Sequence, residues 1–535
     1  MLAGVALGLS FQPYGLWPLL LVALPAFTLI VRSQRPHGVG LRGAFGLGYL
    51  FGLGLLVVAI SWLHVLGVWV AGLLIAFESL FFGLLAVAIS LVSRYRAWPL
   101  AVACCWALTE FAYARIPFGG FGWTRIAYAA VDTPLAGLLP VAGVAGLSFA
   151  VALIGQLVAW AVLARPRPAR SGSGSLRSGR SVALAAAGVV ALLAVGGALT
   201  RYQVDDLTGD GPAIQVGIVQ GNVPGRGIEA LGRARSVTNN HLSETINLMT
   251  RARLGEVPLP DFVLWPENST DIDPVRDGRT QTTVQAAAEI ADLPILVGAV
   301  TQGPGPDERQ TTALWWDPQS GPVATYHKRN LVPFGEWIPF RSQLLPLVPV
   351  LAQVGSQSIP GTEPGVLEVS VGGRPVRVGD VICFELAYDQ TVYQTVTGGA
   401  QILMVQSNNA TYGGTGQIEQ QFAITRARAM EARREIAVAT TNSVSGFVDR
   451  DGRVVQRTTE FSADSLVAAM PPRSALTPAV RWAPWIERGL SVAGLLLVAG
   501  AVVGRIRARR GRQTPAEAPG LEDYDRNPPR TKEAV

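Results

Sequence analysis

The stretch VRVGDVICFE, residues 376–385, decides the fold of half of this chain. Its β-branched residues run to Ile382, which is typical of a β-strand, and Cys383 follows directly. A cysteine between a strand and a turn is presented at the edge of a sheet, as nucleophiles are in strand-to-helix elbows. Most lone cysteines in strands are only small buried apolar residues, so the interpretation depends on what else reaches that edge.

Two other ionisable residues also follow strand-like runs. Glu267 comes after Phe262–Trp265, and Lys328 comes after 323–326. The ends of strands are where open α/β sheets place their sites. A carboxylate flanked by Trp and Pro suits a general base, and a lysine can stabilise an oxyanion. Alone, each is more simply a surface residue; with the Cys383 thiol they predict an acyl-transfer site.

Residues 211–472 have an ordinary globular composition and are predicted to form this α/β domain. Short apolar runs are expected as strands at Ile214–Val219, Phe262–Trp265, Ile295–Val300, Leu314–Trp316, Val376–Cys383, Ile402–Val405 and Ile436–Thr440. Helices are expected between them at Ile228–Arg253, Thr282–Ala291 and Ile418–Arg434.

The rest of the chain is predicted to lie in a membrane. Of 535 residues only 15% are charged and 49% are hydrophobic, and the mean hydropathy is +0.32. A spanning helix needs about 20 apolar residues. We expect eight spans, at Met1–Phe11, Leu16–Val31, Ala44–Leu63, Val68–Val92, Ala97–Tyr113, Pro134–Leu163, Ser181–Thr200 and Gly489–Gly504. Residues 1–205 would form a seven-span bundle, 482–506 a last transmembrane helix, and 507–535 a disordered basic and polar tail.

Arginines in alternate loops predict the orientation. They gather between spans two and three, four and five, six and seven, and after the last span, whereas the intervening loops hold only Arg115 and Arg125. Positive residues stay in the cytoplasm. The α/β domain is therefore expected outside the cytoplasm and the C-terminus inside. Glu110 and Arg115 flank the loop between spans five and six and are expected to pair.

Three motifs occur in a fixed order. Trp265-Pro266-Glu267 comes first, Tyr326-His327-Lys328 follows with the run LVPFGE at 331–336, and Cys383-Phe384-Glu385 comes last. They resemble the Glu-Lys-Cys pattern of the nitrilase (carbon-nitrogen hydrolase) superfamily. With the flanking membrane helices, the chain resembles that superfamily's membrane branch, the apolipoprotein N-acyltransferase family. The resemblance extends from about Phe11 to Gly504.

The resemblance implies an αββα sandwich and a two-step acyl transfer without a cofactor. Glu267 would take the thiol proton of Cys383, which would attack an ester carbonyl of a phospholipid. Lys328 and the backbone N–H of Phe384 would stabilise the oxyanion. The thioester would then acylate the α-amino group of an S-diacylglyceryl cysteine in an apolipoprotein. Two further carboxylates would orient Lys328 and support the site: Glu336 and Glu385.

The implied partners are a phospholipid acyl donor, a diacylglyceryl apolipoprotein acceptor and the bacterial cytoplasmic (inner) membrane. Aromatic residues of the loop before span six, and others near the motifs, are candidates to contact substrate or the membrane interface, although the loop aromatics equally fit an ordinary aromatic belt. They are Phe118, Phe121, Trp123, Trp265, Phe334 and Tyr412. Phe384 stands where the family commonly has tyrosine, and Tyr412 where phenylalanine is usual, which bears on acyl-chain preference.

Other functions stay open on the sequence alone. The same trio would serve a membrane-tethered amidase or nitrilase that hydrolyses a C–N bond, and a non-catalytic lipoprotein-binding scaffold would tolerate loss of Cys383. The histidines are scattered and lack metal-ligand spacing, so we expect no metal site. Three cysteines, two of them adjacent, imply no disulfide framework. We also expect no nucleic-acid partner, and a monomer.

Overall fold

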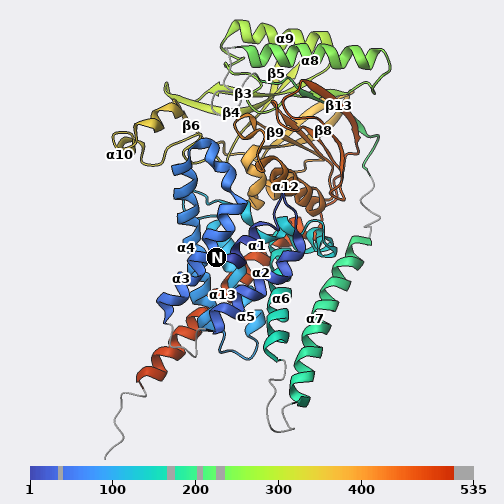
Figure 1. Ribbon diagram of the computed structural model, residues 1–535. Coiled ribbons are helices and arrows are strands. Elements are labelled where there is room, and N and C mark those ends of the chain that lie inside the picture. The colour runs from blue at the N-terminus through green and yellow to red at the C-terminus, as the bar shows by residue number, and fades with distance from the viewer. Residues whose placement is uncertain (34–39, 165–174, 202–208, 224–234, 511–535) are drawn as a thin grey trace, which may run out of the picture.

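The computed structural model describes residues 1–33, 40–164, 175–201, 209–223 and 235–510. Two parts are stacked on one another (Figure 1). Helices from the first 200 residues, together with the last helix, form a bundle, and two β-sheets with their covering helices stand on one end of it.

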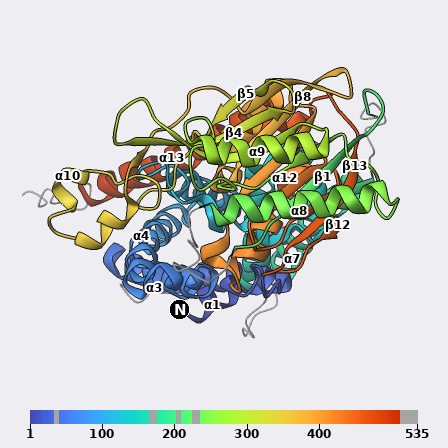
Figure 2. The same cartoon turned by 90° about the horizontal axis from the view of Figure 1, so that it is seen from above.

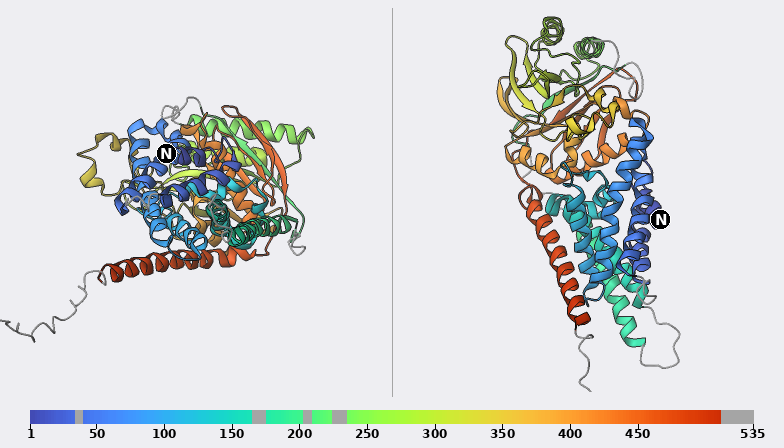
Figure 3. Two further views of the ribbon diagram at one scale, coloured as in Figure 1. Left: turned by 60° about the horizontal axis from the view of Figure 1, so that its bottom comes forward. Right: turned by 90° about the vertical axis from the view of Figure 1, so that its left-hand side faces the viewer.

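The bundle consists of apolar helices of unequal length. They are α1 (Leu2–Gly8), α2 (Leu20–Ser33), α3 (Leu41–Ala59), α4 (Val68–Val92), α5 (Trp98–Tyr113), α6 (Leu139–Ala164), α7 (Ser175–Arg201) and α13 (Pro478–Arg510). Within the described residues, five helical segments are long and apolar enough to cross a membrane: Leu41–Ala59, Val68–Val92, Pro134–Ala164, Gly179–Thr200 and Pro478–Ala508. Figure 3 shows α13 running along the flank of the bundle, away from the sheets.

Helix α1, within the short stretch Met1–Phe11 that is expected as the first span, is too short to cross a bilayer. Its seven residues rise only about 10 Å, a third of the hydrocarbon thickness of a bilayer. It packs instead against α3, where a Cβ on Gly4 would lie 2.0 Å from the carbonyl oxygen of Phe51. Helices α2 and α5 have 14 and 16 residues, so the number of eight spans stays a prediction.

The α/β domain contains two sheets. The first has the order β13-β1-β2-β3-β4-β5, with β6 beside β4, and the second has the order β12-β11-β10-β9-β8-β7. The bounds are β1 (Ile214–Gln220), β2 (Phe262–Leu264), β3 (Ile295–Gln302), β4 (Glu308–Asp317), β5 (Gly321–His327), β6 (Gln357–Ser358), β7 (Val366–Val371), β8 (Arg374–Ile382), β9 (Ile402–Ser407), β10 (Ile436–Thr440), β11 (Gly446–Val448), β12 (Val454–Arg457) and β13 (Asp464–Met470).

Each of the predicted strand runs falls on one of these strands. Helices are α8 (Ser236–Arg253), α9 (Gly278–Ala291), α10 (Arg341–Leu344), α11 (Asp389–Thr397) and α12 (Gln417–Ala432). Of the predicted helix Ile228–Arg253, residues 228–234 lie outside the described residues, and Arg235 precedes α8 in a left-handed conformation.

Apolar side chains divide the domain into four layers. Val216, Phe262 and Val378 belong to a core between the two sheets. Leu248 and Val284 belong to another core under α8 and α9, which cross the outer face of the first sheet (Figure 2). On the outer face of the second sheet, α11 and α12 share one continuous core with the bundle, from Leu7 to Val448. The resulting order is α–β–β–α, with the second helical layer pressed against the membrane helices.

A buried ionic cluster joins the two parts. Arg125 donates to Asp389 of α11 at 2.6 Å and to Glu487 of α13 at 3.0 Å, and Arg428 of α12 donates to Asp389 at 2.6 Å. Glu431 of α12 accepts from Arg428 at 2.7 Å. Nearly all these side chains are fully buried, so each charge depends on its partners.

The predicted pair of Glu110 with Arg115 is wrong. Arg115 donates to Glu487 at 2.5 Å, and Glu110 accepts from Arg125 at 3.4 Å. The reason is that the loop after α5 folds back under the catalytic domain, which carries Arg125 inward to the carboxylates.

Candidate active site

The three motif residues meet because each follows a strand of one of the two facing sheets. Glu267 comes after β2, Lys328 directly follows β5, and Cys383 directly follows β8. Cys383 begins the 3-10 turn Cys383–Ala387 with a positive φ of 54°. A non-glycine residue in this region is strained, and such strain clusters at functional sites.

Lys328 lies between two carboxylates. Its Nζ donates to Oε1 of Glu267 at 2.8 Å and to Oε1 of Glu336 at 3.0 Å. The other oxygen of Glu267 accepts from the backbone N–H of Asn408 at 2.8 Å, and that of Glu336 from the N–H of Val332 at 2.8 Å. The side chains of Lys328 and Glu267 are only 1% and 5% exposed, so water screens this ion pair weakly.

Glu267 and Lys328 are the charged side chains that act most strongly on the Cys383 thiol. Burial raises the pKa of the thiol well above its ordinary value, and the charge of Glu267 raises it further, whereas Lys328 lowers it. The resting group is therefore a neutral thiol with a carboxylate beside it, which is the arrangement that a base-activated nucleophile requires.

Lys328 keeps its charge. Burial by itself would lower the pKa of this amine, but the charges of Glu267 and Glu336 outweigh burial and hold the pKa well above its usual value. A fixed ammonium in a dry site stabilises a developing oxyanion more strongly than it would in water.

Glu385 supports the site differently from the expectation that it orients Lys328 directly. It accepts hydrogen bonds from the hydroxyl of Tyr326 at 2.9 Å and from the backbone N–H groups of Arg329 at 2.7 Å and Ile382 at 2.9 Å. Tyr326 and Arg329 lie on either side of Lys328 at the end of β5, and Ile382 precedes Cys383 at the end of β8. The buried carboxylate thus ties the two strand ends together, and it also interacts electrostatically with Lys328 without a direct hydrogen bond to it.

An aromatic wall continues from the nucleophile into the bundle. Phe384 stacks on Phe121 and Trp123, with ring centroids 5.9 and 6.0 Å apart. Trp62, in the turn before α4, contacts Trp123 at 5.8 Å and Tyr412 at 5.2 Å. The loop aromatics Phe121 and Trp123, singled out in the sequence, are therefore brought to the residue that follows Cys383.

The sequence pointed to neither Trp62 nor Gln420. The side-chain oxygen of Gln420 accepts from the indole N–H groups of Trp62 at 2.9 Å and Trp123 at 2.8 Å. Its amide donates to the carbonyls of Gln12 and Ala59 at 2.7 Å. A glutamine on a polar helix carries no sequence signal of this role, because its partners lie some 300–400 positions away.

The other aromatic candidates divide into two groups. Phe118 lies at the surface with Phe334, Trp337 and Phe340, at centroid distances of 6.0–6.4 Å. Trp265 is not a surface residue: it is fully buried in the core under α8 and α9, where its indole donates to Thr245 at 2.9 Å. The sequence interpretation failed here because Trp265 faces away from Glu267 along the strand end.

No three His, Cys, Asp or Glu side chains of the described segments are placed to hold a metal ion. The functional groups at hand are a thiol, a carboxylate and an ammonium, with Glu336 and Glu385 around them. This set suits nucleophilic acyl transfer with proton movement between sulfur and carboxylate.

Comparison with known proteins gives two family matches. Residues 3–157 match the apolipoprotein N-acyltransferase N-terminal domain, and residues 254–477 match the carbon-nitrogen hydrolase family. An apolipoprotein N-acyltransferase of Mycolicibacterium smegmatis is 36% identical over 96% of this chain and 86% of its own length. One from Azotobacter vinelandii is 28% identical over 96% of each chain. Among solved structures, an amidase from Nesterenkonia sp. is 17% identical over 50% of this chain and 94% of its own, with a TM-score of 0.36.

Proposed function

The chain belongs to the apolipoprotein N-acyltransferase family, and from this membership we propose that it transfers an acyl chain from a phospholipid to the α-amino group of the S-diacylglyceryl cysteine of apolipoproteins. The observation that carries the proposal is one carboxylate paired with one ammonium, both acting electrostatically on one thiol, beside a wall of membrane-domain aromatics.

The first half-reaction forms a thioester on Cys383. Glu267 takes the thiol proton, and the sulfur attacks the ester carbonyl of the phospholipid. Lys328 and the backbone N–H of Phe384 stabilise the oxyanion. When the carbon–oxygen bond breaks, Glu267 returns the proton to the leaving oxygen, and a lysophospholipid departs.

The second half-reaction moves the acyl chain to nitrogen. The free amine of the diacylglyceryl cysteine attacks the thioester carbonyl, and Glu267 accepts a proton from it. The carbon–sulfur bond breaks, the proton returns to Cys383, and the product is a triacylated lipoprotein with an amide bond. No redox step occurs, since the thioester conserves the acyl-transfer potential of the original ester.

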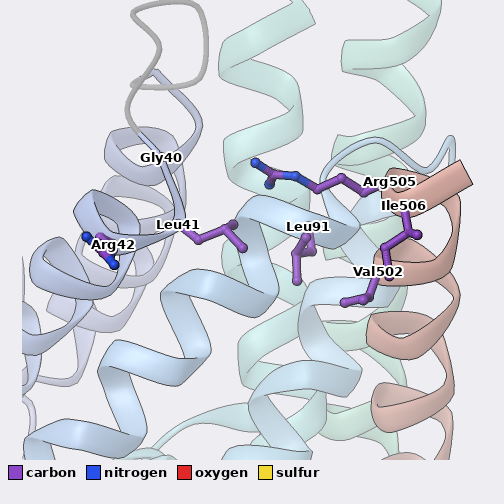
Figure 4. A pocket seen from close by; sticks show the side chains of 7 residues that line it. All are labelled: Gly40, Leu41, Arg42, Leu91, Val502, Arg505 and Ile506. Atoms are coloured by element: carbon purple, nitrogen blue, oxygen red, sulfur yellow. The ribbon is translucent and has the colours of Figure 1, made fainter. Parts of the chain in front are cut away.

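We propose that the catalytic domain lies outside the cytoplasm of the bacterial inner membrane. The described arginines of the predicted cytoplasmic loops adjoin helix ends far from the sheets, where α2 ends, α3 begins and α4 ends (Figure 1). There Arg42 of α3 and Arg505 of α13 border one cavity, with Leu91 and Val502 on its apolar side (Figure 4). Clustering of positive charge at this end supports a cytoplasmic location for it.

The exposed aromatics support access from the lipid. Phe118, Phe334 and Phe340 are 40–67% exposed and lie between the end of the bundle and the catalytic domain. Aromatic rings are favoured where lipid headgroups meet the hydrocarbon region. We propose that they guide acyl chains toward Cys383, and that the covered α11–α12 layer keeps the protein monomeric.

The decisive experiment traps the thioester. Purified protein is incubated with phospholipid that carries a labelled acyl chain, and Cys383 is then examined for a hydroxylamine-sensitive adduct by mass spectrometry. A diacylated lipopeptide added next should gain one acyl chain.

Cys383→Ala should carry no adduct, and Cys104→Ala, which removes a thiol buried in α5, should leave it unchanged. Ammonia release from amides without a mass gain on the lipopeptide would favour a hydrolase instead. Normal lipopeptide acylation by Cys383→Ala would favour a non-enzymatic role for this site.

A further inference from the structure

A cavity of about 460 Å³ lies between the membrane helices and the catalytic domain. Its wall combines Arg115 and Gly119 from the segment after α5 with Arg329, Tyr388 and Gln394 from the catalytic domain. Tyr388 places it close to the nucleophile, because its ring packs edge-on against Phe384 at 5.3 Å.

Neighbouring residues indicate that this cavity lies at the level of lipid headgroups. Arg115 is bound to Glu487 of α13, and the surrounding turns of α13 expose Trp482 by 60% and Trp485 by 63%. Exposed tryptophans on a membrane helix mark the boundary between hydrocarbon and water. The phosphate groups of one leaflet therefore lie at the height of Arg115.

Two of the three arginines that line the cavity are neutralised. Arg115 is paired with Glu487, and Arg125 with Asp389, Glu487 and Glu110. Arg329 differs from both. Its Nη1 donates to the side-chain oxygen of Gln394 at 2.7 Å, but its buried Nε and Nη2 have no hydrogen-bond partner among the described residues.

The unpartnered atoms form one functional edge of the guanidinium. Nε–H and Nη2–H of an arginine point in parallel, which is the fork that binds two oxygens of a phosphate at once. Buried donors without partners are costly, and an oxyanion that reached this fork would relieve that cost. Gln394 holds the third nitrogen and so fixes the direction of the fork.

We propose that this cavity binds the phosphodiester of the phospholipid acyl donor, with Arg329 as its bidentate ligand. The inference rests on the proposed acyl-transfer function and adds to it a specificity-determining residue next to Lys328. A lipid held by its phosphate here would have its ester groups directed past Tyr388 and Phe384 toward Cys383. Neutral glycerolipids without phosphate would lack this anchor.

The test separates binding from turnover. Cys383→Ala protein, which cannot form a thioester, is titrated in detergent with dioleoylphosphatidylglycerol, with dioleoylglycerol and with inorganic phosphate, and bound lipid is counted by native mass spectrometry. We expect at least tenfold tighter binding of the phospholipid than of dioleoylglycerol. Adding Arg329→Gln should abolish this preference, and Arg329→Lys should keep part of it.

Two further variants make the result specific. Arg377→Gln removes the same charge from an exposed ion pair with Glu368 on the second sheet and should keep the full preference. Thr362→Trp fills the cavity from an exposed position and should lower phospholipid binding without disturbing the core.

Three results would overturn the proposal: equal binding of the two lipids, a phospholipid preference that survives Arg329→Gln, or Arg329-dependent binding of inorganic phosphate alone. Failure of the wild-type protein to form a thioester would count against the acyl-transfer function and would leave these binding results intact.

Discussion

The thiol of Cys383 is under opposing influences from its two charged neighbours. Glu267 raises its pKa and Lys328 lowers it, in addition to the increase caused by burial. The carboxylate that we propose as the base of the reaction therefore also keeps the thiol protonated at rest. This allows the thiol to persist without oxidation until a substrate carbonyl draws the proton away.

Replacing Glu267 with glutamine should lower the pKa of Cys383 while abolishing acyl transfer. The neutral amide no longer destabilises the thiolate, and Lys328 still stabilises it, so the thiolate forms at lower pH than in the wild type. The rate of iodoacetamide modification of Cys383, followed against pH by mass spectrometry, should shift to lower pH. Cys104 and Cys105, buried in α5, are internal references that should not shift. An unchanged or opposite shift would contradict the assignment of Glu267 as the base.

The sequence predicted which three residues the structure brings to the strand ends, but not all of their surroundings. Glu267, Lys328 and Cys383 could be found because each follows a recognisable apolar strand in a distinctive motif. The hydrogen bonds of Glu385 to Tyr326 and Arg329 depend on how β5 and β8 lie in separate sheets, which no local pattern reports. Trp265 was misjudged because an aromatic residue beside a site has the same sequence signature whether it faces the site or the core.

Among the elements, the strands were the easiest to predict and the short helices the hardest. Buried strands read as apolar runs, so their positions follow from hydrophobicity. Strands β6, β7, β11, β12 and β13 were not among the predicted runs, because β6 and β11 have only two and three residues and β7 and β13 alternate apolar with polar or exposed positions. The end of α1 at Gly8 could not be predicted, because the apolar residues Leu9 and Phe11 follow it in the sequence.

Gln420 of α12 should prove essential to the aromatic wall. Gln420→Ala leaves the buried indole N–H groups of Trp62 and Trp123 without an acceptor. At roughly 1–3 kcal/mol for each unsatisfied buried donor, the protein should lose about 2 kcal/mol or more of stability. The thermal midpoint in detergent and the rate of thioester formation should both fall.

Glu419→Ala is the matched comparison, since it truncates the neighbouring side chain of α12, whose exposed ion pair with Arg457 does not involve the indoles. It should therefore retain more thioester formation than Gln420→Ala. Equal rates in the two variants would show that the indole contacts do not position the wall.

At the scale of the whole molecule, the two parts share one hydrophobic core and one ionic cluster. The α11–α12 layer contacts bundle helices instead of water, and the buried Arg428 bonds to Tyr128 of the bundle at 3.1 Å and to the carbonyl of Leu386, within the nucleophile turn, at 2.9 Å. The sequence predicted two domains but not the shared core and ionic cluster that join them. The charged residues of that cluster are scattered over hundreds of positions in the chain.

The catalytic segment alone, residues 209–477, should not behave as an independent domain. Its apolar outer helices would be exposed, and Asp389 and Arg428 would lose the partners that Arg125 and Tyr128 provide. Size-exclusion chromatography should show aggregation, and a water-soluble thiol-reactive ester should not acylate Cys383 at the rate found for the full chain. A monodisperse fragment with the full rate would show that the bundle only anchors the enzyme.

The shared core also has a consequence for how two bulky substrates use one sulfur. A catalytic domain that is packed rigidly on the membrane bundle cannot move between a separate donor site and acceptor site. The phospholipid and the apolipoprotein therefore have to bind at the same place, one after the other. The lysophospholipid must dissociate before the apolipoprotein binds, so the order of binding takes the place of a domain movement. If the lysophospholipid dissociates slowly, its release would limit the rate of the whole reaction cycle.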